Sequence, residues 1–227
     1  MREFNEAGCF LQKSAYKNMS QNFLQSLHNQ ALLLVPEFGF SEKTLREACK
    51  KLGRAEIDFR LAFDGGVIDW ISYYLDWLDD ELIAQAKNLP LAEMKIRSRI
   101  HSLVMLRISL LQHEKNISRK LLATLSTPAY FSFSAKRVWK TADIIWRLAG
   151  DSATDFNHYS KRALLSGVYS STLLYWLQDE SEKYCKTVTF LERRIAEVIS
   201  FGQKSKTARD NIKDFFPPIL KQAFSHE

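Results

Sequence analysis

Residues 38–66, FGFSEKTLREACKKLGRAEIDFRLAFDGG, decide which fold the chain adopts. Gly39 is a helix stop signal and Ser41 is a preferred helix N-cap, so the pattern predicts a helix that ends at Gly53. A further short helix, RAEIDFRLAF, follows after a tight turn and ends near Asp64. Short helices joined by a tight turn in this way are typical of a helix-turn-helix unit.

Helical periodicity continues on both sides of this unit. Apolar residues recur at three- and four-residue spacing nearly everywhere, and sustained alternation of apolar and polar residues is absent, which predicts an all-α fold. One helix is expected from Ser20 to Glu37 and another from Val67 to about Lys87. Beyond Pro90 the spacing predicts further helices over about 91–114, 117–126, 134–149, 154–179, 183–203 and 207–225.

The expected helices divide the chain into three parts. Residues 1–19 are an N-terminal extension whose order the pattern does not decide. Residues 20–88 form the helix-turn-helix-like unit, and residues 89–227 form a larger helical bundle with an amphipathic helix at its C-terminal end.

The composition is that of a globular protein, with 46% hydrophobic and 26% charged residues. No apolar run is long enough to span a bilayer, and the polar start of the chain does not resemble a secretion signal. Three widely spaced cysteines, Cys9, Cys49 and Cys185, fit reduced thiols, so we expect a cytoplasmic protein.

The order of the N-terminal helices resembles the tetracycline-repressor family of regulators. However, the helix that would enter the DNA groove carries Glu56 and Asp58, whose carboxylates would face a polyanion. A net charge of +6 permits attraction to nucleic acid or to an anionic bilayer without choosing between them. We therefore expect a repressor-like scaffold without specific nucleic-acid binding; a regulator with a hydrophobic ligand is the alternative.

A polar stretch at residues 150–162, GDSATDFNHYSKR, places Asp155 three residues before His158, a spacing that can hold a metal on a helix. A di-iron bundle needs two Glu-x-x-His motifs and two further glutamates, and no histidine here has Glu three residues before it. Asp155 is also expected in a first helical turn, where the helix dipole favours a carboxylate. His101 and His113 are expected on helix surfaces. We predict no metal, no cofactor and, since no catalytic motif is present, no enzymatic activity.

The helix that starts in this stretch has two faces. A core face is predicted at Leu165, Val168, Thr172 and Tyr175. A face of mostly small residues, suited to close approach of a second helix, is predicted at Ala163, Gly167, Ser170 and Leu174. This combination favours a homodimer.

The segment WRLAGDSATDFNHYSKRALLSGVYSST, followed by LQDES and FLERRI, is similar to the Coq-nine family of ubiquinone-biosynthesis lipid-binding proteins, best over about residues 139–203. The resemblance implies a tetracycline-repressor-like dimer that does not read DNA. It implies a non-enzymatic accessory protein that binds an isoprenoid or quinone lipid and presents it to the di-iron quinone hydroxylase of the same pathway.

The same resemblance implies a surface that docks this hydroxylase. The matching positions are Leu148, Asp155, His158, Tyr159 and Arg162. His158 departs from the family, in which eukaryotic members commonly carry Trp. Because large aromatic side chains often anchor interfaces, this departure weakens the expected contact.

The C-terminal stretch TARDNIKDFFPPILKQAFSHE carries an apolar stripe with basic flanks. The stripe comprises Ile212, Phe215, Phe216, Ile219, Leu220 and Phe224. Such a face suits a membrane interface or the cap of a lipid cavity, and packing on the protein's own bundle is the alternative. We predict lipid or membrane contact here and peripheral attachment to the inner membrane. Aromatic residues of the C-terminal half are expected mostly in the core, with some lining an apolar tunnel.

Overall fold

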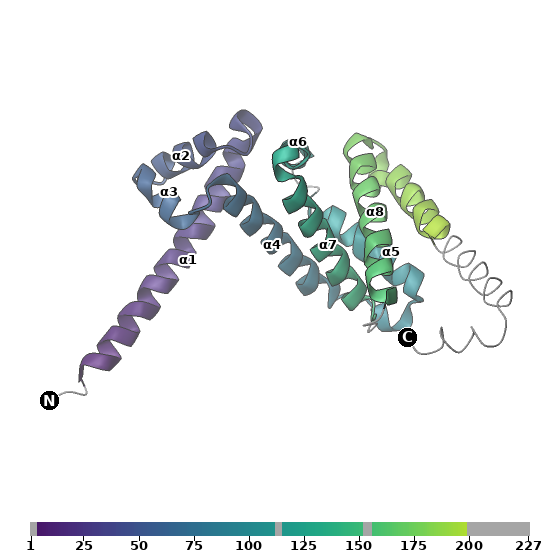
Figure 1. The fold of residues 1–227 in the computed structure, drawn as a ribbon, viewed down its shortest axis with the longest axis horizontal. Helices are drawn as coiled ribbons and strands as arrows, with labels where there is room; N and C mark the ends of the chain where they lie inside the picture. Colours follow the sequence, from purple (N-terminus) through teal and green to yellow (C-terminus); the bar gives the residue numbers. More distant parts are fainter. Residues whose placement is uncertain (1–3, 112–114, 152–155, 199–227) are drawn as a thin grey trace, which may run out of the picture.

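The computed structural model describes residues 4–111, 115–151 and 156–198, with no account of the side chains of residues 4–20 and 156–158. All regular elements in these ranges are helices, which confirms the predicted all-α class. Figure 1 shows two short helices grouped beside the end of a long first helix, and one helix running from this group into a bundle. The predicted boundaries of a small N-terminal unit and a larger bundle stay a prediction.

The N-terminal unit consists of α1 (Phe4–Phe38), α2 (Glu42–Lys51) and α3 (Glu56–Ala62). The α2 cap is as predicted, because the Ser41 hydroxyl accepts a hydrogen bond from the Thr44 amide at 3.3 Å. The start of α1 was predicted wrongly at Ser20. Extending an existing helix adds one hydrogen bond for each residue fixed, so α1 continues N-terminally without needing an apolar face there.

Helix α4 (Val67–Ala86) belongs to both parts of the molecule. Its N-terminal half is packed against the helix-turn-helix-like unit through Trp70 and Ile71, which are fully buried. Its C-terminal half contributes Leu78 and Leu82 to the bundle core, and both of these are also fully buried. One continuous hydrophobic core therefore connects the two parts.

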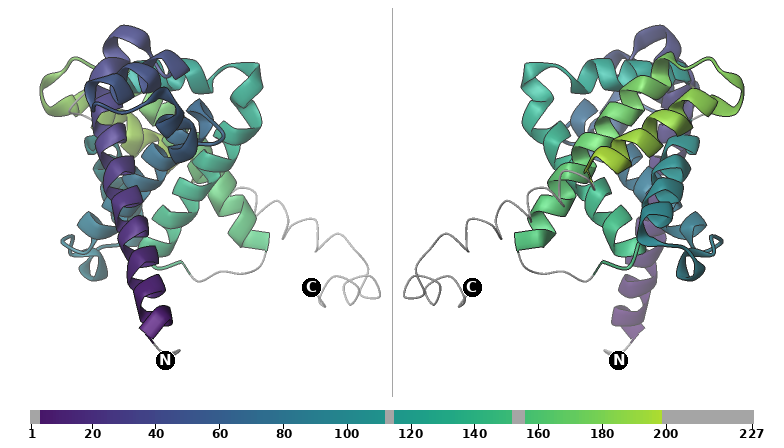
Figure 2. Two further views of the ribbon diagram at one scale, coloured as in Figure 1. Left: turned by 90° about the vertical axis from the view of Figure 1, so that its left-hand side faces the viewer. Right: turned by 90° about the vertical axis from the view of Figure 1, so that its right-hand side faces the viewer.

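The bundle contains α5 (Ile96–Ser109), α6 (Lys115–Leu125), α7 (Phe131–Leu148) and α8 (Phe156–Gln178), followed by a helix over residues 185–198. Figure 2 shows this last helix lying along α8. Three short 3-10 turns connect the helices: η1 (Leu91–Glu93), η3 (Pro128–Tyr130) and η4 (Glu182–Tyr184). The helix expected over 91–114 is thus a 3-10 turn followed by a shorter α-helix.

Asp179 explains the abrupt start of the last described helix. One carboxylate oxygen accepts hydrogen bonds from the amide and hydroxyl of Ser181, and the other accepts from the amide and hydroxyl of Thr187. Burial alone would raise the pKa of Asp179, but these four hydrogen bonds hold it far below its usual range. The carboxylate therefore fixes the chain reversal between α8 and the helix over 185–198.

A buried histidine joins α1 to α4. Trp70 donates from its indole nitrogen to His28 Nδ1 at 3.1 Å, and the His28 ring is packed against Tyr73 and Tyr74. His28 is only 4% exposed, and burial lowers its pKa to about 4. The neutral imidazole is therefore the form that the folded protein requires.

This histidine makes stability depend on pH. The unfolded chain protonates His28 below about pH 6.5, whereas the folded chain resists protonation until about pH 4. We expect His28 to lower the free energy of unfolding by about 1.4 kcal/mol for each pH unit between these limits as the pH falls. Urea denaturation of the wild type and of His28→Gln, which retains an acceptor for Trp70, would measure this. An equally steep pH dependence in the variant would contradict the assignment.

Candidate functional site

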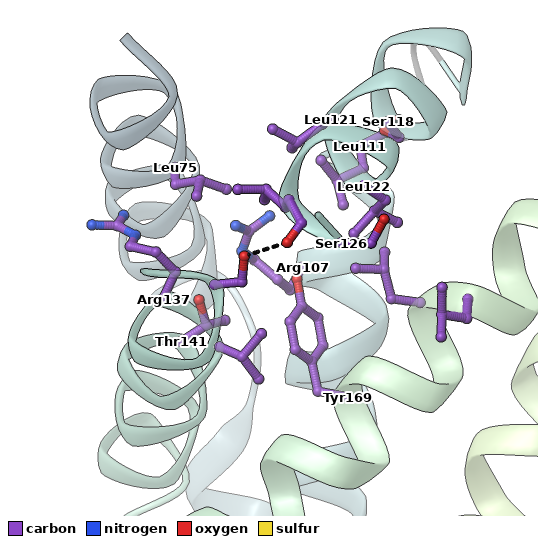
Figure 3. Close-up of a pocket in the computed structure, with 15 residues that line it drawn as sticks. Leu75, Arg107, Leu111, Ser118, Leu121, Leu122, Ser126, Arg137, Thr141 and Tyr169 are labelled. Carbon is purple, nitrogen blue, oxygen red and sulfur yellow. Dashed lines mark hydrogen bonds between the residues drawn. The ribbon is translucent and has the colours of Figure 1, made fainter. Parts of the chain in front are cut away.

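A mostly apolar cavity of about 190 Å³ lies inside the bundle. Figure 3 shows its lining, which comes from α4, α5, α6, α7 and α8. Leucines supply most of the wall: Leu75, Leu111, Leu121, Leu122, Leu125, Leu173 and Leu174. The side chain of Leu174 is 57% exposed and Ser126 is also exposed, so these residues mark the outer rim. An apolar cavity of this kind, with few polar groups, is typical of a small-ligand site.

The inner end of the cavity is polar. Arg107 is 1% exposed, and its Nε lies 3.4 Å from Oδ1 of the equally buried Asp79. Thr141 donates a hydrogen bond to the same carboxylate oxygen at 3.0 Å. Figure 3 shows the Arg107 side chain among the lining residues, between Leu75 and Tyr169. Burial raises the pKa of the Tyr169 phenol, so this hydroxyl is neutral at physiological pH.

A second ion-pair layer lies on the solvent side of Asp79. Arg137 Nη2 is 2.8 Å from Asp76 Oδ1 and 3.7 Å from Asp79 Oδ2. Lys140 also pairs with Asp76. Burial alone would raise the pKa of Asp76, but the hydrogen bonds from Arg137 and Lys140 hold it below its usual range. Asp76 is thus compensated at the surface, whereas Asp79 is buried behind the cavity-lining Arg107 and Thr141.

An apolar tunnel lined by aromatic residues was predicted for the C-terminal half, and the lining of this cavity differs from that prediction. Of the aromatic residues considered for an apolar tunnel, only Tyr169 lines it, and leucines take the place of the others. A usable signal was present in the sequence, since Asp79 and Arg107 each interrupt an otherwise apolar helical face. Charged residues are almost never fully buried unless they are paired, so two such interruptions indicate a buried pair.

The residues predicted to dock the hydroxylase lie where α7 meets α8. Those whose side chains the structure describes differ in how exposed they are. Tyr159 is 62% exposed, with its ring centroid 6.3 Å from that of Trp139 on α7. Leu148 is half-buried against the core. Asp155 and the side chain of His158 lie outside the described residues. Arg162 is only 1% exposed, so it does not lie on an accessible surface.

Arg162 instead holds the two helices together. Its Nε donates to Asp143 on α7, and its Nη1 lies 3.2 Å from Asp151 in the connecting segment. Lys161 adds a second contact to Asp151 at 2.6 Å. Burial alone would raise the pKa of Asp151, but the hydrogen bonds from Lys161 and Arg162 hold it below its usual range. The polar stretch at residues 150–162 therefore has a structural role in part, because it contributes the ion pairs that join α7 to α8.

The Gly-Asp turn before α8 also has a steric reason. Gly150 has a φ of 92°, which L side chains rarely adopt, and a Cβ there would lie 3.0 Å from Arg99 Nη1. Arg99 uses this nitrogen to donate to the Ala149 carbonyl at 2.9 Å, which anchors the end of α7 to α5. Glycine thus allows the guanidinium to reach the helix end.

A second apolar pocket of about 160 Å³ lies on the other side of α8. Its lining includes Ile100 on α5, Trp146 on α7, Leu164 on α8 and Ile195 on the last described helix. The predicted core face of α8 is confirmed for Leu165, Val168 and Thr172, but Tyr175 is 38% exposed and stacks on Phe190. The predicted small-residue face is accessible, since Ala163, Gly167 and Leu174 are exposed and Ser170 is half-buried.

Of His101 and His113, both predicted on helix surfaces, the structure describes only His101. His113 lies outside the described residues, and His101 is half-buried, with Nε2 lacking a hydrogen-bond partner among the residues described. The expected surface position of His101 was therefore wrong, because α5 packs against the helix over 185–198. Within the described ranges, no cluster of three His, Cys, Asp or Glu side chains could hold a metal ion.

The surface of α3 carries both charges and exposed apolar groups. Arg60 pairs with Glu42 at 3.2 Å and Glu56 pairs with Arg46 at 2.9 Å, so these basic groups are partly neutralised. Leu61 is 78% exposed. The absence of specific DNA binding stays a prediction.

The C-terminal residues proposed for lipid or membrane contact lie outside the described ranges. No helix among the described residues is long and apolar enough to cross a bilayer.

Comparison with known proteins finds similarity to one family over part of the chain. Residues 131–202, which span α7, α8 and the last described helix, match the COQ9 family model. The predicted resemblance is confirmed, and the matched range nearly coincides with the range of residues 139–203 expected from the motifs.

Full-length relatives extend the similarity beyond this domain. Ubiquinone biosynthesis protein COQ9-A, mitochondrial, from Xenopus laevis is 30% identical over 192 residues, which cover 80% of this chain and 59% of that protein. The corresponding Homo sapiens COQ9 protein is 24% identical over 189 residues, covering 79% of this chain and 58% of that protein. The chain thus spans less than two thirds of the length of these COQ9 relatives.

A solved structure supports the predicted fold. A TetR transcriptional regulator from Nitrosomonas europaea ATCC 19718 superimposes with a TM-score of 0.63, covering 78% of this chain and 98% of the regulator. The sequence identity of 18% shows likeness of fold alone. The tetracycline-repressor-like architecture is therefore confirmed for this COQ9-related chain.

The buried contacts of Arg162 predict that this residue stabilises the fold more than an exposed arginine with a shared partner does. We expect Arg162→Met to lower the free energy of unfolding by about 2 kcal/mol, because it removes the buried partner of Asp143 and Asp151 and leaves them only the more exposed Arg147 and Lys161. Arg147 pairs with the same Asp143 but its side chain is 71% exposed, so Arg147→Met should change stability by less than about 1 kcal/mol. Chemical denaturation would compare the two variants, and equal losses would show that the buried contacts of Arg162 have no special weight.

Proposed function

We propose that this protein is a non-enzymatic accessory factor of ubiquinone biosynthesis, which binds an isoprenoid or quinone lipid and presents it to the pathway's hydroxylase. The observation that carries the proposal is the apolar cavity between α4 and α8 in a chain related to COQ9 proteins. The names of these relatives give a role in ubiquinone biosynthesis and no named catalytic activity.

The proposed working form is a homodimer at the inner membrane surface. The exposed small residues Ala163 and Gly167 of α8 support dimerisation, because they let a second helix approach closely, and Leu174 two turns further along lies outside the proposed contact. The apolar stripe from Ile212 to Phe224 would supply the membrane contact. Sedimentation and flotation with anionic liposomes test these two features independently.

Lipid binding is tested by blocking the cavity. Val138 lines it from α7, and a Val138→Trp substitution would fill much of its volume. We expect the lipid retained after purification from a quinone-producing host to fall about tenfold, as measured by native mass spectrometry.

A matched control places the same side chain elsewhere. Leu164 lines the second pocket, so Leu164→Trp should leave the retained lipid unchanged. A wild-type protein that is entirely free of lipid and does not bind liposomes would refute the proposed function. Loss of lipid in the Leu164 variant alone would move the binding site to the second pocket.

Docking of the hydroxylase is proposed around Tyr159, the exposed aromatic among the expected contact residues. Aromatic side chains are frequent anchors of interfaces, so we expect Tyr159→Ala to weaken binding of the hydroxylase about tenfold. Surface plasmon resonance would measure this affinity. The control is Tyr175→Ala, which replaces another exposed tyrosine on α8. Unchanged affinity in the Tyr159 variant would exclude this surface as the docking site.

A regulator with a hydrophobic ligand is the second candidate, supported by the likeness to a TetR regulator. Its test is a gel shift on DNA from the protein's own genomic neighbourhood at several salt concentrations. A regulator would bind one operator with steep salt dependence, because phosphate contacts release counterions. The acidic residues of α3 favour the accessory-factor proposal over this candidate.

A further inference from the structure

We infer that the inner end of the cavity binds the oxygen-bearing head of an amphiphile, with Arg107 as the hydrogen-bond donor and the apolar tail leaving past Leu174. This inference rests on the proposed lipid-binding function and specifies the chemistry and orientation of the ligand. The head is a single ring or a group of similar size with a carbonyl or anionic oxygen.

The charge balance around Asp79 supports an oxygen ligand. Asp76 is paired at the surface with Arg137 and Lys140. On the buried side, Asp79 is the acidic partner of Arg107 and is also within 3.7 Å of Arg137. The network therefore holds three cations, Arg107, Arg137 and Lys140, and two carboxylates, so it carries one net positive charge.

The hydrogen bonds of Arg107 are also incomplete. Neither Nε nor Nη1 has an acceptor among the described residues, although both atoms are buried. A guanidinium carries five N–H donors, and leaving buried donors without acceptors is unfavourable. Because the Arg107 side chain lines the cavity, a ligand oxygen at its inner end would accept a hydrogen bond from this guanidinium.

The volume of the cavity and its exposed rim determine how the proposed ligand is oriented. An apolar cavity of about 150 Å³ in another protein accommodates benzene, so about 190 Å³ accommodates one substituted ring and not a polyprenyl chain. The wall beyond the polar end is formed by side chains such as Leu122 and Leu174, and Leu174 reaches the surface. The head therefore occupies the inner end, and the remaining chain extends along the apolar rim.

Three probes with the same decyl chain test this inference on the full-length protein. Decylbenzene has no oxygen, 4-decylbenzoate has a carboxylate, and decylubiquinone has quinone carbonyls. After delipidation, isothermal titration calorimetry should show that at least one oxygen-bearing probe binds about tenfold more tightly than decylbenzene, because hydrogen bonds to a charged donor are strong. Whichever probe binds most tightly identifies the preferred oxygen as carbonyl or anionic.

The decisive variant is Arg107→Met, which keeps the length of the side chain and removes its donors. We expect it to reduce the preference for oxygen-bearing probes to about twofold or less while decylbenzene still binds. Since this variant removes the closest cation from the buried Asp79, Asp79→Asn/Arg107→Met provides a second version without that charge. Arg97→Met, at the second pocket, is the matched control and should keep the full preference.

The outcomes separate this inference from the proposed function. Equal binding of all three probes to the wild type, or an oxygen preference that survives in the double variant, would overturn the inference and leave lipid binding intact. Binding of none of the probes, together with no retained lipid in native mass spectrometry, would overturn both.

Discussion

The Asp79 carboxylate is buried where α4, α5 and α7 meet, and each neighbouring helix supplies a group that compensates it. Arg107 comes from α5, and Thr141 and Arg137 come from α7. A buried charge without such partners would cost several kcal/mol, so these helices must assemble in one arrangement. Because α4 also carries Trp70 and Ile71 into the N-terminal unit, the same constraint fixes that unit relative to the bundle.

A second buried ion-pair group controls the other end of the bundle. Arg162 binds Asp143 and Asp151, and Arg99 holds the final carbonyl of α7. Asp143 and Asp151 are thus bound to the buried Arg162, while Tyr159 remains exposed one turn before it. A surface that is held by buried contacts beneath it is pre-organised, which lowers the entropic cost of binding a partner.

The sequence predicted the features that depend on neighbouring residues. Ser41 could be placed as a cap, and the core positions of α8 could be placed from helical spacing, because both follow from local geometry. The buried role of Arg162 could not be predicted, since its partners lie on α7 and in the segment that follows. The leucine lining of the cavity was missed for the same reason: five helices contribute to it, and no local pattern shows which leucines leave a space between them.

The position of Arg107 has a consequence for how a lipid would be delivered. If the oxygen-bearing head lies at the inner end, the group that a hydroxylase must modify is shielded while the protein carries it. Delivery then requires the head to leave Arg107, and the tail at the Leu174 rim is the part that a membrane or partner can engage first. Hydrogen bonds to Arg107 must therefore be strong enough to orient the ligand and weak enough to be exchanged. A guanidinium that already shares its charge with Asp79 meets this condition better than an unpaired one, because the carboxylate keeps the empty site stable after release.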